Sequence, residues 1–153
     1  MDVTKREDLT AFVPSAELSS SYLSSGIGVS GGAIGGQVVF DLDDVKEFRG
    51  KDPSIPLILI RSDTVPDDIS FISVADGLLT ARGGATSHAS IIAKKLGKTC
   101  VVGCNNLLVL EHEKKFKLAG RTVTVGEFLS IDGRNGSIYI GKHNIGEIKV
   151  LTE

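Results

Sequence analysis

Two kinds of segment alternate along residues 57–102, and this alternation limits the fold more than any other feature of the sequence. Three short apolar runs occupy Leu57–Ile60, Leu78–Thr80 and Thr99–Val102. The residues between them have helix-forming patterns, and the second of these patterns opens at His88. Strands that alternate with helices in this way are predicted to lie parallel in one sheet, with the helices packed on it.

The last third of the chain has a different pattern. A turn at Ala119–Gly120 separates Lys117–Leu118 from a β-branched run, and a second turn at Asp132–Gly136 leads into Ser137–Ile140. Apolar runs joined by such short turns predict β-hairpins, in which neighbouring strands are antiparallel. The sequence therefore predicts an α/β fold of mixed parallel and antiparallel strands, with helices on the sheet.

The first 36 residues carry weaker signals. Residues 1–25 are polar and rich in serine, and we expect them to form an N-terminal arm that is partly mobile, ahead of a single domain over 26–153. Residues 26–36 contain six glycines in eleven positions, without the helix and acidic residue of a dinucleotide fingerprint. The glycines mark either a close approach of strands and loops, which is favoured, or direct contact with phosphate.

Composition excludes several classes of function. Lys and Arg number 17 against 19 Asp and Glu, a net charge of −2, so no basic surplus exists for a nucleic-acid backbone or a membrane surface. Aromatic residues make up 5% of the chain and Trp is absent, which leaves little for base stacking. No apolar run reaches signal-peptide or membrane-spanning length, and we expect a cytoplasmic protein.

The two cysteines, Cys100 and Cys104, match neither a redox pair nor half of a zinc site. If both lie on one strand, their side chains point to the same face and are too far apart for a disulfide. We expect both to be reduced and buried, and the sequence predicts no metal site. His112 and His143 lie in polar segments and are expected to be solvated rather than functional.

The segment Arg82–Lys94, with the sequence RGGATSHASIIAK, carries the most chemistry. Thr86 and Ser87 are residue types that cap a helix N-terminus, and Ala89, Ile92, Ala93 and Leu96 then follow at helical spacing on one face. Gly97 is expected to end the helix.

This arrangement places His88 at the start of a helix. Free N–H donors and the helix dipole favour anions there, phosphate above all, and disfavour an imidazolium. A neutral imidazole can act as a nucleophile, and the pair Gly83–Gly84 lets backbone N–H groups turn toward an anion. His88 is therefore a candidate phosphoryl acceptor. The alternative is that His88 is a helix residue without a chemical role.

At this point the sequence resembles a known family. GGATSHASIIA at residues 83–93, LILIRSDTVPDDI before it, GKTCVVGC after it and the closing LSIDGRNGSIYIGK are similar to the mobile phosphohistidine domain of phosphoenolpyruvate-utilising enzymes. The family includes pyruvate phosphate dikinase, phosphoenolpyruvate synthase and enzyme I of the sugar phosphotransferase system. The flanking segments are most similar to pyruvate phosphate dikinase. The resemblance implies a three-layer swivelling β/β/α domain.

The resemblance also implies roles for individual residues. His88 would be phosphorylated on a ring nitrogen, and Thr86 and Ser87 would hydrogen-bond the imidazole or the phosphate. Gly83 and Gly84 would give partner sites close access. Arg61 and Thr64, which match an R-x-x-T stretch of the family, would orient the loop or the phosphate. From the sequence alone, a surface ion pair of Arg61 with Asp63 or Asp67 is an equal alternative.

In such enzymes the phosphoryl group passes between an ATP-grasp nucleotide-binding domain and a TIM-barrel domain that binds phosphoenolpyruvate and pyruvate. This sequence contains neither, so the resemblance predicts both as partners on other chains, with Mg²⁺ at the partner sites and no cofactor bound by this domain. Without partner domains no turnover is expected. Two functions stay open: a phosphoryl carrier of a dikinase-like or synthase-like phosphotransfer system, and a non-catalytic docking or regulatory module that keeps the fold.

Overall fold

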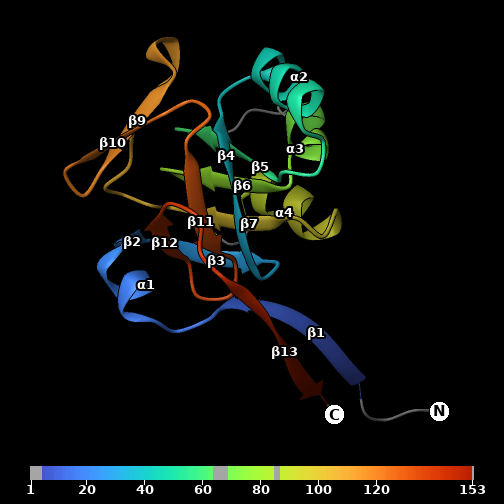
Figure 1. Cartoon of the computed structure of the whole chain (residues 1–153). Helices are drawn as coiled ribbons and strands as arrows, with labels where there is room; N and C mark the ends of the chain where they lie inside the picture. The colour runs from blue at the N-terminus through green and yellow to red at the C-terminus, as the bar shows by residue number, and fades with distance from the viewer. Residues whose placement is uncertain (1–4, 64–68, 85–86, 153) are drawn as a thin grey trace.

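An eight-stranded mixed sheet forms the centre of the molecule (Figure 1). The computed structural model describes residues 5–63, 69–84 and 87–152. The strand order across the sheet is β2 (Tyr22–Ser25), β12 (Ser137–Ile140), β11 (Phe128–Asp132), β4 (Ala33–Val39), β5 (Leu57–Arg61), β6 (Gly77–Thr80), β7 (Thr99–Val102) and β3 (Ile27–Ser30). Strands β4 to β7 pair in parallel, and all the other pairs in this sheet are antiparallel. The predicted mixture of parallel and antiparallel strands is confirmed.

Three helices, α2 (Leu42–Lys51), α3 (Ile69–Val74) and α4 (His88–Lys95), follow β4, β5 and β6 and lie on one face of this sheet (Figure 1). The alternation of side chains along a strand explains why one face receives them. In β5, Leu57 and Leu59 are buried in the cluster that contains Ala89 and Ala93 of α4. The helices therefore pack on the face to which these two leucines point.

A second, smaller sheet covers the opposite face. Its strands, in the order β10-β9-β8, are β10 (Arg121–Thr124), β9 (Lys115–Leu118) and β8 (Leu108–Leu110), and the short 3₁₀ helix η2 (Glu111–Glu113) joins β8 to β9. Phe116 and Val123 of the small sheet share a buried cluster with Ile58 and Ile60 of β5. The molecule thus has three layers, small sheet, large sheet and helices, which is the predicted β/β/α arrangement.

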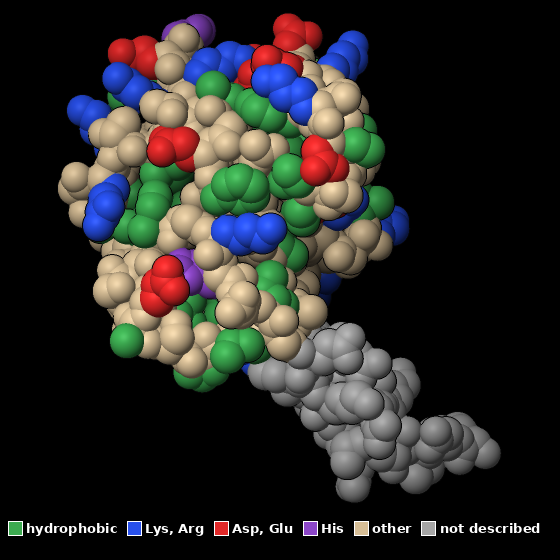
Figure 2. Space-filling view, in the orientation of Figure 1, with side chains coloured by type: hydrophobic (Ala, Val, Ile, Leu, Met, Phe, Trp, Pro, Cys, Tyr) green, Lys and Arg blue, Asp and Glu red, His purple; other side chains and the backbone are tan. Residues whose placement is uncertain are grey.

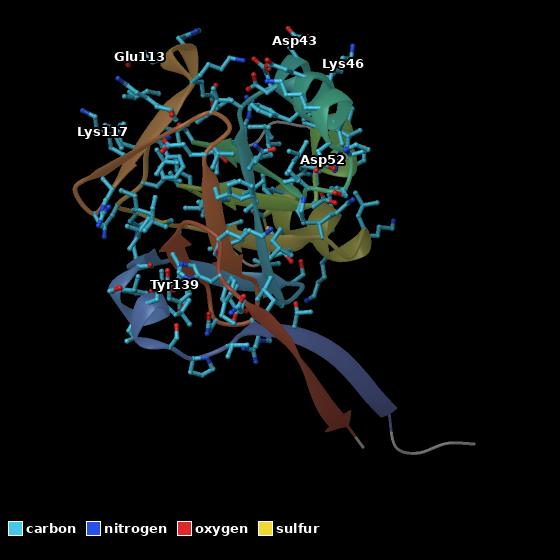
Figure 3. All side chains as sticks on the ribbon, in the orientation of Figure 1. Asp43, Lys46, Asp52, Glu113, Lys117 and Tyr139 are labelled. Carbon is cyan, nitrogen blue, oxygen red and sulfur yellow. The ribbon has the colours of Figure 1, made fainter. Side chains whose placement is uncertain are left out.

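The two ends of the described chain meet in a separate ribbon. Strand β1 (Lys5–Phe12) pairs antiparallel with β13 (Ile145–Thr152), and this pair projects from the body of the molecule (Figure 1). At its base, Phe12 contacts the rings of Tyr139 and His143, with ring centroids 5.3 and 6.4 Å apart; Figure 3 labels Tyr139 near this junction. His143 is thus half-buried among aromatic rings and not fully solvated as expected.

The segment predicted as an N-terminal arm contributes to the main body. After helix α1 (Ala16–Ser20), strand β2 forms an edge of the eight-stranded sheet. The expected boundary after residue 25 therefore comes directly after a strand that belongs to the sheet of the main domain. The side chain of Leu18 is buried against Phe12 and Ala33. Serine-rich sequence gave no sign of this strand because serine is a weak strand former.

The glycine-rich segment 26–36 supplies β3 and most of β4, and its glycines lie where backbones approach closely. A Cβ atom on Gly28 would stand 2.7 Å from the carbonyl oxygen of Gly133. This contact supports the interpretation that the glycines allow close approach of strands and loops.

Both cysteines are free and buried, as expected, but they do not face the same side. Strand β7 ends at Val102, and Gly103 takes a φ of 65°. The turn places Cys104 in the cluster on the small-sheet face, while Cys100 lies on the helix face. Burial raises the pKa of Cys100 to about 12 and also raises that of Cys104.

Two surface properties agree with the composition. On the face shown in Figure 2, acidic and basic side chains are interspersed, without a large area of one sign. Within the described residues, no helix combines the length and the apolar character that crossing a membrane requires.

Candidate functional site

The loop that leads from β6 to α4 begins as an extension of the sheet. Beyond the end of β6, the N–H of Ala81 donates to the carbonyl of Arg61 (3.2 Å) and the N–H of Arg82 to that of Ser62 (3.0 Å). On the other side, the N–H of Gly103 donates to the carbonyl of Arg82 (3.4 Å). The start of the loop is therefore held from both neighbouring strands, at the carboxyl end of the parallel strands where α/β proteins place their sites.

Helix α4 starts where the sequence predicts. Ser87 is its N-cap, with extended backbone (φ −64°, ψ 160°), and its side chain accepts a hydrogen bond from the N–H of Ser90 at 3.3 Å. His88 is the first helical residue, and its side chain is exposed. The predicted capping by Ser87 is confirmed, whereas Thr86 lies outside the described residues.

The first turn of α4 leaves backbone donors available. The N–H of Ile91 donates to the carbonyl of Ser87, and that of Ser90 is used by the cap. The N–H groups of His88 and Ala89 have no acceptor among the residues that the structure describes. The first N–H groups of any α-helix have no partner within the helix. Those of His88 and Ala89, with the positive end of the helix dipole, make the surroundings of the exposed imidazole favourable for an anion.

Ser90 is a residue of this site that sequence reasoning missed. It is completely buried, and its Oγ lies 2.6 Å from the carbonyl oxygen of Gly84 and 2.9 Å from the Oγ of Ser87. The signal in the sequence was present: Ser87 and Ser90 are three residues apart, which is the spacing of a cap and the N–H that it accepts from.

The far end of α4 is closed as expected at Gly97, which has a φ of 69°. The N–H of Lys98 donates to the carbonyl of Ala93 (2.9 Å), and that of Gly97 to the carbonyl of Lys94 (3.2 Å), a Schellman motif. The spacing places Leu96 on one helix face with Ala89, Ile92 and Ala93. Leu96 is nevertheless 44% exposed, because the helix ends at Lys95 and Leu96 is the C-cap.

The glycine pair divides into two roles. Gly83 has a φ of 104°, a conformation that side chains other than glycine rarely adopt, and a Cβ there would lie 3.3 Å from Ser87 Oγ. No described atom lies within 4 Å of the position that a Cβ on Gly84 would take. Glycine is required at position 83 by the backbone, whereas a side chain at position 84 would meet no described atom.

The backbone of Arg61 lies near the loop, and its side chain contacts groups on other elements of the structure. Its NH1 lies 3.3 Å from the carbonyl oxygen of Phe40 and 3.6 Å from a carboxylate oxygen of Glu111. The guanidinium also lies over the ring of Phe71, 5.8 Å from its centroid. Among the described residues no hydrogen bond joins Arg61 to His88, and Thr64 lies outside them.

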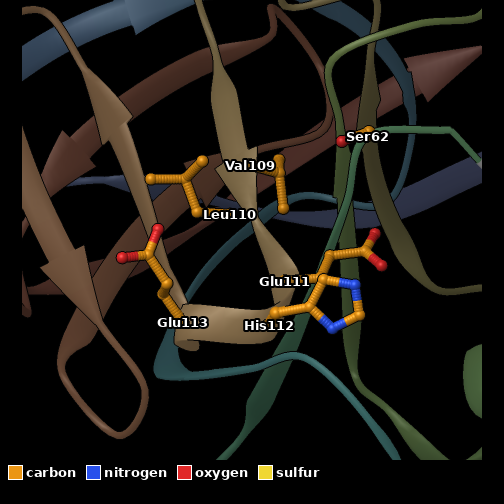
Figure 4. A pocket seen from close by; sticks show the side chains of 6 residues that line it. All are labelled: Ser62, Val109, Leu110, Glu111, His112 and Glu113. Atoms are coloured by element: carbon orange, nitrogen blue, oxygen red, sulfur yellow. The ribbon is translucent and has the colours of Figure 1, made fainter.

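A cavity of about 440 Å³ opens beside Glu111 (Figure 4). It is lined by Ser62, Val109, Leu110, Glu111, His112 and Glu113. None of the predicted site residues that the structure describes is part of this lining. Nor do the described ranges contain a group of three or more His, Cys, Asp or Glu side chains that could hold a metal ion.

Next to this cavity, Lys114 connects the small sheet to α2. Its Nζ lies 2.7 Å from Asp44 Oδ1 and 2.5 Å from Asp41 Oδ2. Burial acts to lower the pKa of Lys114, but the bonds to the two carboxylates outweigh it and the pKa is raised. For Asp41, burial acts to raise the pKa, but the bond and charge of Lys114 together with the backbone N–H groups of Asp44 and Asp43 outweigh it, and the pKa is lowered.

Comparison with known proteins decides the family. The family described as "PEP-utilising enzyme, mobile domain" matches residues 54–136, more than half of the chain. The chain belongs to this family. The matched residues run from the start of β5 through the loop and helix that carry His88 to the end of the β11–β12 turn.

Relatives of known identity are much longer. Pyruvate, phosphate dikinase 2 of Oryza sativa subsp. japonica is 40% identical over 133 residues, covering 84% of this chain and 15% of the relative. Pyruvate, phosphate dikinase of Clostridium symbiosum is 38% identical over 139 residues, covering 91% of this chain and 16% of the relative. This chain thus spans about one sixth of the length of these dikinases.

One solved structure is similar over part of the chain. The NMR solution structure of the Enzyme I (nEIt) protein has 27% sequence identity, a TM-score of 0.41, and coverage of 58% of this chain and 32% of that protein. Because this overlap is partial, the description of the three layers above depends only on the strands and buried clusters of this chain.

Proposed function

We propose that this domain carries phosphoryl groups on His88 within a phosphotransfer system similar to pyruvate phosphate dikinase or phosphoenolpyruvate synthase. One observation carries the proposal: an exposed imidazole stands at the first position of a capped helix, beside two backbone N–H donors with no described acceptor. Membership in the mobile-domain family and the dikinase relatives support the same function.

The transfer is a displacement at phosphorus. A ring nitrogen of His88 attacks the phosphorus of the donor, the N–P bond forms, and the bond from phosphorus to the donor oxygen breaks, with its electron pair leaving on that oxygen. The N–H groups of His88 and Ala89 and the helix dipole offset the charge of the bound phosphoryl group. The reverse displacement hands the group to an acceptor.

Other parts of the reaction belong to partners. In this proposal the nucleotide is bound by an ATP-grasp domain, and phosphoenolpyruvate and pyruvate are bound by a TIM-barrel domain, outside the residues of this chain. Mg²⁺ and the clamps on the transferring phosphate act at those sites, and this domain binds no cofactor. The domain contributes position and a nucleophile, so by itself it turns over nothing.

Labelling tests the proposal. The purified protein is mixed with ³²P-labelled phosphoenolpyruvate and the barrel domain of a pyruvate phosphate dikinase, or with labelled ATP and its nucleotide domain. The expected result is a base-stable, acid-labile label on the wild type and on His112→Ala, and none on His88→Ala. His112 is the matched control because it is also an exposed histidine.

Two results would contradict the proposal. A label that persists in His88→Ala would show that the carrier is another residue. A wild-type protein that binds either partner domain but takes no label from either donor would favour the docking or regulatory module instead.

A further inference from the structure

Three atoms in the loop and the first turn of α4 form a hydrogen-bonded chain with a defined direction. Ser90 Oγ is 2.6 Å from the carbonyl oxygen of Gly84, which can only accept, so the single hydroxyl hydrogen of Ser90 is donated there. The 2.9 Å contact between the Oγ atoms of Ser87 and Ser90 must then use the hydrogen of Ser87. The hydroxyl of Ser87 therefore donates to the hydroxyl of Ser90, which donates to the carbonyl of Gly84.

This direction uses all the donors of both hydroxyl groups. Ser87 Oγ gives its only hydrogen to Ser90 and accepts from the N–H of Ser90 at 3.3 Å. In this arrangement Ser87 has no hydrogen left to donate to a phosphate or an imidazole. The donors that face an anion at His88 are then backbone N–H groups.

The same chain closes the turn that carries the histidine. The carbonyl oxygen of Gly84 accepts two hydrogen bonds, from Ser90 Oγ at 2.6 Å and from the N–H of Ser87 at 3.0 Å. The first of these bonds ties the loop to the third residue of the helix, Ser90, through a side chain that is completely buried. Water cannot replace a hydroxyl in such a place without opening the packing, so the turn is held in one geometry.

We propose that Ser90 is a positioning residue for phosphoryl transfer at His88, an inference that rests on the proposed function. Its hydroxyl fixes the turn from Gly84 to Ser87, and so sets where the imidazole starts its attack. It also holds the Ser87 hydroxyl inward, which leaves the phosphoryl group to the N–H groups of His88 and Ala89. Ser90 itself touches neither the imidazole nor the phosphate.

A buried serine can also serve stability alone, and the molecule contains a matched control. Ser130 of β11 is likewise completely buried, and its Oγ donates to a glycine carbonyl, that of Gly141, at 2.7 Å. The change of Ser130 to Ala removes the same group, the same kind of bond and the same volume, away from α4. A purely structural role for Ser90 predicts the same behaviour for both variants.

The test compares Ser90→Ala and Ser130→Ala in transfer from labelled phosphoenolpyruvate through the dikinase barrel domain, with the carrier as the varied substrate. For Ser90→Ala we expect kcat to fall about 10- to 100-fold, as misplacement of a reacting group does, with KM for the carrier unchanged because no exposed group is altered. For Ser130→Ala we expect both constants to stay within about twofold of the wild type. Thermal unfolding of both variants supplies the stability comparison.

Two further variants complete the test. Ser90→Cys keeps the shape of the side chain, with a somewhat larger atom, but replaces the hydroxyl by a weak donor. It should show the same loss of kcat even if Ser90→Ala does not fold. In the double variant of Ser87→Ala and Ser90→Ala, the losses of kcat should not add, because both changes interrupt the same chain of hydrogen bonds.

The possible outcomes separate the two proposals. If the wild type is labelled and Ser90→Ala and Ser90→Cys retain the kcat of Ser130→Ala, the positioning role is wrong and the carrier function stands. If the wild type takes no label, the carrier function fails and the role of Ser90 fails with it.

Discussion

Two exposed histidines, His88 and His112, lie in segments that are held in different ways. His88 follows a loop that is bonded to both neighbouring strands and opens a helix with a side-chain cap. His112 lies in η2, a single 3₁₀ turn whose N-cap makes no side-chain hydrogen bond, beside the 440 Å³ cavity. The cavity would suggest η2 as the site.

The difference between the two segments shows that a phosphoryl carrier needs an exposed and well-anchored nucleophile more than it needs a cavity of its own. An enzyme that binds a small substrate needs a cavity, but a phosphoryl carrier must enter the cavity of a partner. What it needs from its own fold is an exposed nucleophile on an anchored backbone and donors for the charge that arrives. The start of α4 has these features, and η2 lacks the cap and the helical N–H groups.

The largest effect on stability is expected in the small sheet, which does not carry His88. Leu118 of β9 is 1% exposed in the cluster between the two sheets, so Leu118→Ala should lower the free energy of unfolding by about 2–5 kcal/mol. Because α4 packs on the other face, the rate of His88 labelling at a temperature below unfolding should stay at the wild-type value. Urea unfolding and the labelling assay measure the two quantities; a loss of labelling in the folded variant would break the separation of the two regions.

A smaller loss of stability, with a large loss of labelling, is expected at Gly83. At its φ of 104°, an alanine is strained by about 1–3 kcal/mol, and its Cβ would press on Ser87 Oγ. Gly83→Ala should therefore destabilise the protein and slow phosphorylation of His88 together.

Gly120→Ala is the matched control for Gly83→Ala. Gly120 has a φ of 76° in the turn between β9 and β10, and apart from its chain neighbours no described residue has an atom within 4 Å of its Cβ position. This variant should lose stability and keep the labelling rate. Equal labelling rates in the two glycine variants would show that the geometry of the loop does not matter for transfer.

The smallest effect is expected at Lys114, beside the cavity. Lys114→Met leaves Asp44, whose side chain is 8% exposed, without one of its partners, and should cost about 1–3 kcal/mol at neutral pH. Burial acts to raise the pKa of Asp41, but Lys114 and two backbone N–H groups together lower it from 3.8. The share of stability that Lys114 contributes is therefore complete above pH 3.8 and is lost as the pH falls through the folded-state value.

The stability difference between the wild type and Lys114→Met should therefore be constant at neutral pH and shrink below about pH 4. Chemical unfolding across this pH range measures it. A difference that grows on acidification would contradict the ion-pair explanation, and the labelling rate of His88 should not change at any pH at which both proteins are folded.

Local sequence signals were sufficient for the parallel half of the fold. The predicted run Thr99–Val102 is the observed β7, and the helix start at Ser87 and His88 follows from capping chemistry that acts within four residues. The hairpin of β11 and β12 was readable from its turn. The conformation of these elements is thus determined mainly by residues within the elements themselves.

The remaining elements depend on residues far away in the sequence. Strand β1 pairs with β13, with Phe12 opposite Ile145, and no local pattern in either segment indicates that pairing. The side chain of Arg61 is directed by Glu111 and Phe71, which tertiary packing brings to it. The side chain of Cys104 does not lie on the predicted face of the sheet, because Gly103 turns the chain. Residue spacing alone cannot distinguish a glycine in a turn from a glycine in a strand.

The sequence was enough to name a candidate nucleophile, but not the buried serine that lies beside it. His88, Ser87 and the glycine pair were named from residue types alone. Ser90 was missed because a serine inside a helix reads as a neutral choice until its buried partners are known. The predicted contacts of Thr86, Arg61 and Thr64 with a phosphate stay predictions, and the contact predicted for the Ser87 hydroxyl competes with its hydrogen bond to Ser90.

The central claim is that the backbone at the start of α4, and not exposure alone, makes His88 the acceptor. Phosphoramidate phosphorylates imidazoles with loss of ammonia, so it can test this claim without a partner protein. The phosphorylation of each histidine is followed separately, by ³¹P NMR and by peptide mapping at alkaline pH. We predict that His88 is phosphorylated at least about tenfold faster than His112, because its N–H donors and helix dipole stabilise the charge. Equal rates at the two exposed histidines, or a faster reaction at His112, would contradict the account.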